Sequence, residues 1–120
     1  MIYEYYWLRH FISITSSVGI GNALANRTNI FNTLGDEGWE LLPSLSQKHE
    51  FCFRRPSNPS KRIRYEYQWR RLWISPASDT QIQAGLETRT KLFNNLSKQG
   101  YSPVMEDVSM FCFMRKDRKD

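Results

Sequence analysis

The sequence predicts an α+β two-layer sandwich built from two copies of one strand–helix–strand–strand unit. Three observations lead to this prediction. The chain resembles itself when it is shifted by about 62 residues, each copy contains a segment with helical apolar spacing, and segments with strand-like alternation lie on both sides of it. Together the copies predict a mainly antiparallel sheet of about six strands, with two helices on one face.

The internal repeat rests on large side chains that recur in one frame. Tyr3-Glu4-Tyr5 recurs as Tyr65-Glu66-Tyr67. Further pairs in this frame are Trp7 and Trp69, Arg9 and Arg71, Arg27 and Arg89, Phe31 and Phe93, Gly38 and Gly100, and, after a two-residue deletion, Phe51-Cys52-Phe53 and Phe111-Cys112-Phe113. A repeat of this length indicates one supersecondary unit per copy.

The repeat divides the chain into two units. We expect the first β-α-β-β repeat over residues 1–55, a linker over residues 56–62 and the second repeat over residues 63–120. The linker is expected because this stretch contains two prolines and a run of small polar residues. A lone unit of about 60 residues buries too little surface to be more than marginally stable, so the two units are expected to pack as one globular domain.

The first strand of each unit has two different faces. In the second copy Tyr65, Tyr67 and Trp69 alternate with polar residues, which predicts a half-buried strand whose aromatic face points into the core. In the first copy the opposite face also carries apolar residues, namely Ile2, Tyr6, Leu8 and Ile12. An apolar face on the solvent side of a strand is typical of a contact surface, although it can also be a second layer of core.

A helix and a hairpin complete each unit. Ser78 or Asp79 is a suitable N-cap for the second helix, and Gly38 and Gly100 are expected to end the two helices in the left-handed conformation. The hairpin strands are expected at residues 39–42 and 50–55, and at residues 101–105 and 110–115. Pro103 favours an edge position for its strand, because proline cannot donate a ladder hydrogen bond.

The motifs of the first copy resemble those of a set of small bacterial and phage domains of unknown function. These domains begin with a Tyr-Glu-Tyr strand, continue with a helix that ends in Gly-Trp-Glu-Leu, and close with a strand that bears Phe. The corresponding segments here are Tyr3-Glu4-Tyr5, Gly38-Trp39-Glu40-Leu41 and Phe51-Cys52-Phe53. The second copy departs from the pattern at Gly100-Tyr101-Ser102-Pro103. The resemblance implies a fold unit and a prokaryotic or phage source, and it implies no activity.

Four arginines repeat at equivalent places and are candidates for an anion site. Arg9 and Arg71 lie in the aromatic row of the first strand, and Arg27 and Arg89 interrupt the apolar stripe of the helix. A buried unpaired charge is costly, so each guanidinium needs an anion, an aromatic face or the solvent. They could hold an anionic, nucleotide-like ligand between helix and sheet. The alternative, which we favour, is that they pair with Glu4, Glu66 or backbone carbonyls.

The sequence contains no signature of catalysis, so we expect a protein that is not an enzyme and has no cofactor and no metal. Cys52 and Cys112 occupy equivalent positions without a second cysteine or a histidine pair nearby in the sequence, which argues against zinc. Two cysteines form no disulfide framework, and Met1 leads directly into a strand-like segment. We therefore expect a cytoplasmic protein that does not insert into membranes.

The leading hypothesis is a non-enzymatic binding or inhibitory protein that acts through protein–protein contact, such as a phage or mobile-element protein that blocks a host factor. The residues expected at this interface are Ile2, Tyr6, Leu8, Arg54, Arg55, Arg62 and Arg64. The alternatives are the anionic-ligand module and single-stranded nucleic-acid binding, where aromatic side chains beside basic ones stack on bases. The formal net charge of +5 permits nucleic-acid binding without requiring it. A homo-oligomer is also considered.

Overall fold

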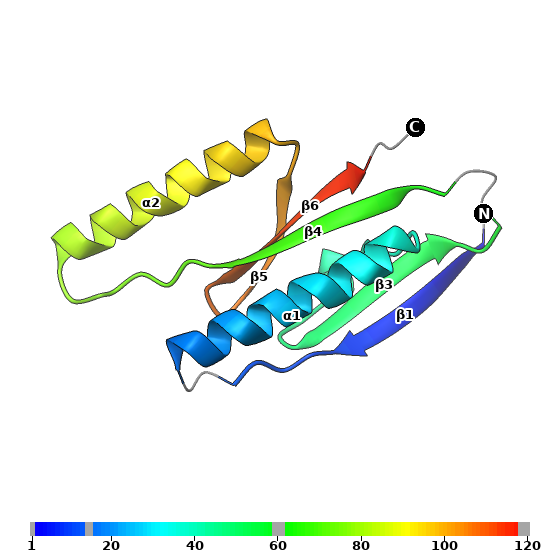
Figure 1. Ribbon diagram of the computed structural model, residues 1–120, viewed down its shortest axis with the longest axis horizontal. Coiled ribbons are helices and arrows are strands. Elements are labelled where there is room, and N and C mark those ends of the chain that lie inside the picture. Colours follow the sequence, from blue (N-terminus) through cyan, green and yellow to red (C-terminus); the bar gives the residue numbers. More distant parts are fainter. Residues whose placement is uncertain (1, 14–15, 59–61, 118–120) are drawn as a thin grey trace.

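The computed structural model describes residues 2–13, 16–58 and 62–117, and Figure 1 shows the arrangement. Residues 59–61 of the expected linker lie outside the described residues. The elements in order are β1 (Tyr3–Arg9), α1 (Ser17–Asp36), β2 (Glu40–Leu41), the short 3-10 helix η1 (Pro43–Leu45), β3 (Glu50–Pro56), β4 (Arg64–Arg71), α2 (Asp79–Lys98), β5 (Ser102–Asp107) and β6 (Met110–Asp117). The predicted α+β fold class, with two β-α-β-β repeats, is confirmed.

The six strands form two three-stranded antiparallel sheets rather than one continuous sheet. Sheet A has the order β1-β3-β2, and sheet B has the order β4-β6-β5. In both sheets the last strand of the repeat lies in the middle, so the first and second strands run parallel without touching. Pro103 lies in the edge strand β5, as its missing amide hydrogen predicts.

Both helices begin and end with capping residues that can be recognised in the sequence. Ser78 caps α2, because its Oγ accepts a hydrogen bond from the Gln81 amide at 3.2 Å, and Ser16 caps α1 through the Gly19 amide at 3.0 Å. Gly38 and Gly100 follow the two helices with φ values of 89° and 90°. Glycine adopts this conformation with little strain, so both helices end just before these residues.

Each sheet has a helix face, which carries the phenylalanines of its central strand, and an opposite aromatic face, which carries the odd-numbered aromatic residues of its first strand. In sheet A the helix face carries Phe51 and Phe53, which both contact Phe31 of α1 edge to face. In sheet B the aromatic face carries Tyr67 and Trp69, whose rings contact the same Phe31. The main core therefore lies between sheet A, α1 and the aromatic face of sheet B.

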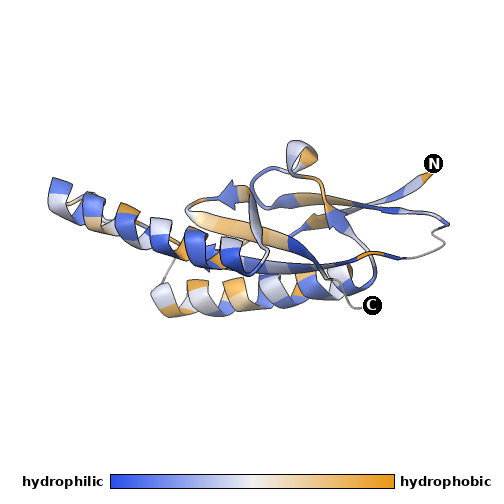
Figure 2. Ribbon diagram, turned by 90° about the horizontal axis from the view of Figure 1, so that it is seen from above, coloured by the Kyte–Doolittle hydropathy of each residue, from blue (hydrophilic) through white to orange (hydrophobic). Residues whose placement is uncertain are grey.

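The second helix lies on the other side of sheet B. Its Phe93 contacts Phe111 and Phe113, which pair with Arg70 and Gln68 and therefore point away from Trp69. Sheet B is thus enclosed between the first repeat and α2. In Figure 2, α2 projects from the rest of the molecule as an arm. Neither helix is long and apolar enough to cross a bilayer, within the residues the structure describes.

Candidate protein-interaction surface

The contact between the two repeats shows how an aromatic face becomes buried in this fold. Strand β4 lies beside α1, and two of its outward-pointing amides donate to helix side chains: Tyr67 N–H to Asn32 Oδ1 at 2.7 Å and Trp69 N–H to Thr28 Oγ1 at 3.2 Å. These acceptors satisfy an edge that would otherwise be open to another strand. The helix therefore replaces a neighbouring strand, which explains why β4 does not extend sheet A.

The phenol of Tyr67 joins sheet B to strand β2. Its hydroxyl donates to the Trp39 carbonyl at 2.8 Å and accepts from the Leu41 amide at 2.9 Å. Burial raises the pKa of this phenol far above its usual value, although the hydrogen bond from Leu41 opposes that shift. The hydroxyl consequently stays protonated and can make both bonds at any physiological pH.

A buried ion pair also crosses between the repeats. Arg27 Nη1 donates to Asp107 Oδ2 at 2.9 Å, and its other nitrogens donate to His10: Nε to Nδ1 at 3.0 Å and Nη2 to the backbone carbonyl at 2.8 Å. The guanidinium lies over the rings of Phe51 and Trp69 at 4.9 and 4.6 Å. Arg27 is therefore fully engaged within the protein.

The equivalent aromatic face of sheet A lies on the surface. Tyr5 and Trp7 are 57% and 58% exposed, whereas Tyr67 and Trp69, the same positions in the second repeat, are 1% and 4% exposed. The prediction that the aromatic face is a core face is thus confirmed for the second copy and wrong for the first. The reason is that the first repeat packs over the aromatic face of sheet B, whereas Tyr5 and Trp7 of sheet A have no such cover among the described residues.

The opposite face of β1 belongs to the core side of sheet A. Tyr6 and Leu8 pair with Phe53 and Phe51, so they lie on the helix face, contrary to the expectation of an outward apolar surface. Leu8 packs against the main core, and Tyr6 lies 5.8 Å from the Trp39 ring while keeping 42% of its surface exposed. Ile2 is exposed, as expected of an interface residue.

The basic residues that were expected at the interface have partners within the fold. Arg54 pairs with Glu40 at 3.5 Å, Arg55 with Glu4 at 3.0 Å, and Arg64 with Asp36 at 2.7 Å. Arg54 also lies over the Tyr3 ring at 4.5 Å, on the aromatic face of sheet A. Arg62 is exposed, and its side chain lies beside Gly38.

The four repeated arginines have different environments. Arg9 is exposed and Arg71 lines a small cavity with Trp73, while Arg27 is buried. Arg89 repeats part of the Arg27 arrangement: its Nη2 donates to the Leu72 carbonyl at 2.6 Å, and its guanidinium lies over Phe111 at 4.8 Å. The ion pair of Arg27 with Asp107 agrees with the structural interpretation of that residue, while an anion site formed by all four stays a prediction.

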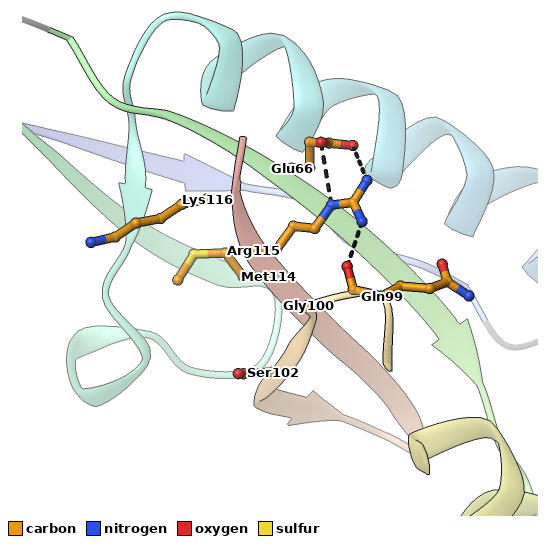
Figure 3. Close-up of a pocket in the computed structure, with 7 residues that line it drawn as sticks. All are labelled: Glu66, Gln99, Gly100, Ser102, Met114, Arg115 and Lys116. Atoms are coloured by element: carbon orange, nitrogen blue, oxygen red, sulfur yellow. Dashed lines mark hydrogen bonds and ion pairs between the residues drawn. The ribbon is translucent and has the colours of Figure 1, made fainter. Parts of the chain in front are cut away.

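A surface cavity of about 610 Å³ lies at the C-terminal end of α2 (Figure 3). Its walls include Gly100 and Arg115, and Arg115 is held by Glu66 through Nε and Nη2 and by the Gln99 carbonyl. The corresponding place in the first repeat, beside Gly38, is filled by the Arg62 side chain that leads into β4. The space beside Gly100 is therefore open where an arginine side chain lies beside Gly38.

One sequence feature indicates that the first strands of the two copies differ in which face is exposed. Its first strand carries Tyr6 and Leu8 where the second copy carries Gln68 and Arg70. In the structure, the helix face of β1 packs toward the main core, whereas the helix face of β4 does not. The difference in residue type reflects this difference in packing. No property of Tyr5 and Trp7 themselves distinguishes them from Tyr67 and Trp69, because the residue types are identical.

Both cysteines are free thiols and are buried by their neighbours. Burial raises the pKa of Cys52 and that of Cys112, and in Cys112 it outweighs the opposing effect of Arg27. A thiol with a raised pKa is mostly protonated at neutral pH and is a poor nucleophile. These positions are therefore packing residues, as the duplication suggests.

Comparison of the chain with protein-family models, with curated protein sequences and with solved structures gave no match. The resemblance to small bacterial and phage domains therefore stays an expectation.

Proposed function

We propose that this chain is a non-enzymatic binding protein, and that the aromatic face of sheet A is its protein-contact surface. The observation that carries the proposal is the contrast between Trp7 and Trp69. The two residues hold the same position in the repeat, yet Trp69 is buried by a neighbouring unit and Trp7 is 58% exposed. A face whose duplicate is completed by protein packing is suited to be completed by protein as well.

The chemistry of this face agrees with a protein partner. Tyrosine and tryptophan bury a large area at low cost in side-chain entropy and are enriched among the residues that dominate binding energy. Tyr3, Tyr5 and Trp7 alternate along β1 and so form one continuous row. The edge of β1 lies next to this row, and its outward amides can bond to a partner as those of β4 bond to α1.

The overall dimensions also leave room for a partner. The radius of gyration is 15.8 Å, compared with about 13.6 Å for a compact chain of this length. The accessible surface is 7744 Å², roughly 900 Å² more than its mass predicts. The excess reflects an elongated molecule of 53 × 30 × 23 Å, which offers more surface to a partner than a compact one of the same mass.

A cytoplasmic location remains part of the proposal. The two free thiols are compatible with a reducing compartment. The inhibitory role and phage origin suggested by the sequence are forms that such binding could take, and the surface described here is the one through which a blocked host factor would be held.

The proposal is tested by a pull-down with two matched variants. Trp7→Ser removes the largest ring of the aromatic face, and Trp73→Ser removes a ring of similar exposure, 60%, from another surface. We expect the wild type and Trp73→Ser to retain the same bound protein and Trp7→Ser to lose it. Equal retention by all three would contradict the assignment of this surface.

Single-stranded nucleic acid is a second candidate, favoured by one observation. Exposed Tyr5 and Trp7 share their face with the basic residues Arg9 and Arg54, and exposed aromatic rings beside positive charge can stack on bases. Binding of this kind weakens steeply with added salt, whereas an apolar protein contact does not. Titration of a fluorescent oligonucleotide at low and high salt separates the two, and loss of binding in Trp7→Ser would place the strand on this face.

A further inference from the structure

We propose that the partner of this surface is a second copy of the same chain. The α2 helix and sheet B of one copy pack against β1 of the other, in the way that α1 and sheet A pack against β4 within one chain. This inference rests on the proposed function and names the partner of the same surface. The template is the internal contact between the repeats, which is visible within one chain (Figure 1). Since the two repeats share their elements, the contact can be formed again between chains.

The receiving helix carries the side chains that the contact requires. Thr90 and Asn94 repeat Thr28 and Asn32, the acceptors for the edge amides of β4. Both are exposed on α2. They lie one helical turn apart, which matches the spacing of two alternate amides along a strand. The amides they would accept from are those of Tyr5 and Trp7.

The aromatic cluster of the second repeat has room for the same two rings. Phe31 contacts four rings: Phe51 and Phe53 of its own repeat, and Tyr67 and Trp69 of the other. Its equivalent, Phe93, contacts only Phe111 and Phe113 among the described residues and keeps part of its surface exposed. Tyr5 and Trp7 of a second chain would supply the two remaining contacts.

Arg89 shows the same half-completed arrangement. Arg27 is enclosed by two rings, Phe51 and Trp69, whereas Arg89 lies over Phe111 alone among the described residues. Its Nε is shielded from solvent and has no hydrogen-bond partner in the described part of the chain. Trp7 of a second copy would cover the other side of this guanidinium.

The contact has to form between chains because β1 and α2 lie at opposite sides of the molecule in both ribbon views (Figures 1 and 2). One chain therefore offers two different surfaces, and association through them is head to tail. Two chains close such an arrangement if each provides β1 to the α2 of the other. Four repeats would then all have their aromatic faces covered.

Two substitutions make the contact between chains weaker than the internal one. Gly35, where a side chain would meet the Tyr65 carbonyl at 2.1 Å, is replaced by Ser97 in the second repeat. The incoming strand must therefore lie farther from α2 at this end. Pro103 replaces Leu41, whose amide donates to the Tyr67 hydroxyl, so the Tyr5 hydroxyl would lack that donor. We expect a reversible, concentration-dependent assembly.

The inference is tested by mixing two variants in sedimentation velocity experiments. Trp7→Ser damages the strand surface, and Asn94→Lys damages the helix surface at an exposed position. We expect the wild type to assemble, each variant alone to remain at 14.3 kDa, with self-association weakened at least about tenfold, and an equimolar mixture to form a species of two chains. The mixture assembles because each variant keeps the surface that the other lacks.

The outcomes distinguish this inference from the proposed function. Variants that stay monomeric when mixed, or a wild type that is monomeric throughout, would overturn self-association. The wild type could instead be monomeric and bind another protein that Trp7→Ser does not bind. In that case the surface assignment stands, and only the identification of the partner as a second copy is wrong. Trp73→Ser serves as control in each experiment and should assemble like the wild type.

Discussion

Arg27 and Asp107 form an ion pair at 2.9 Å with both side chains fully buried, and they belong to different repeats. The arginine was expected from the sequence to need a partner, and its partner is a residue at the end of β5 that the repeat does not conserve, since Gln47 lies at the equivalent bridge position. This pair therefore fixes which surface of the second repeat faces the first.

Removal of one member of this pair should be strongly destabilising. Asp107→Leu leaves the Arg27 guanidinium buried without a counter-charge, and we expect a loss of about 3–5 kcal/mol in the free energy of unfolding. The double variant Arg27→Met with Asp107→Leu should recover much of that loss, because no buried charge remains. Urea denaturation measures both, with exposed Glu87→Gln as a neutral control. A double variant as unstable as Asp107→Leu would contradict this account.

Stability should fall in mildly acidic solution because of His10. Burial, reinforced by the nearby Arg27 charge and opposed by Asp107, lowers the pKa of His10 below 6.5. A lowered pKa means that the unfolded chain takes up the proton first, so the contribution is complete above about pH 6.5 and is lost as the pH falls through the folded-state pKa. His10→Asn retains an acceptor for Arg27 Nε and cannot titrate.

The comparison of wild type and His10→Asn by thermal unfolding between neutral and mildly acidic pH checks this prediction. We expect a shallower acid-induced decrease in the variant. The same slope in both proteins would show that His10 does not account for the decrease.

The hydroxyl groups of Tyr67 and Tyr5 should differ in their effect on stability. Tyr67→Phe leaves the Trp39 carbonyl and the Leu41 amide without their partner in a buried site, and we expect a cost of about 1–3 kcal/mol. Tyr5→Phe changes an exposed residue, so the unfolding free energy of dilute protein should change by less than about 0.5 kcal/mol. Equal effects in chemical denaturation would be inconsistent with the exposure of β1.

Ser97→Gly should strengthen self-association. Ser97 in α2 holds the position that Gly35 holds in α1, where the missing side chain allows the Tyr65 carbonyl to approach the helix. The change removes the Ser97 side chain and so allows an incoming strand to approach α2 in the same way. We expect the dissociation constant measured by sedimentation equilibrium to decrease, and the added assembly to disappear when Trp7→Ser is introduced. Ser97→Ala, which keeps the Cβ atom, is the matched control. An unchanged dissociation constant in Ser97→Gly would mean that the strand does not approach the helix in this way.

The elements of the fold could be predicted from the sequence because their signals are local. Alternation in residues 65–69, the serine N-cap of α2 and the glycine at each helix end are set by neighbours in the chain. The separation into two sheets could not be predicted in this way. It depends on Thr28 and Asn32 bonding to the edge amides of β4, and a polar residue on a helix gives no indication of that role.

The candidate surface illustrates the same limit. Tyr5 and Tyr67 have the same residue type and the same place in the pattern, and only the packing of one repeat on the other makes one exposed and one buried. The apolar residues Tyr6 and Leu8 did signal a difference between the copies. Their position opposite Phe53 and Phe51 shows that the difference concerned the core rather than the interface.

The central claim, that the aromatic face of sheet A is completed by protein, is tested most directly by hydrogen exchange at the amides of Tyr5 and Trp7. We predict fast exchange at both amides in dilute protein, slow exchange at those of Tyr67 and Trp69, and protection of Tyr5 and Trp7 as the protein concentration rises or a captured partner is added. Fast exchange at Tyr5 and Trp7 under all of these conditions would contradict the claim.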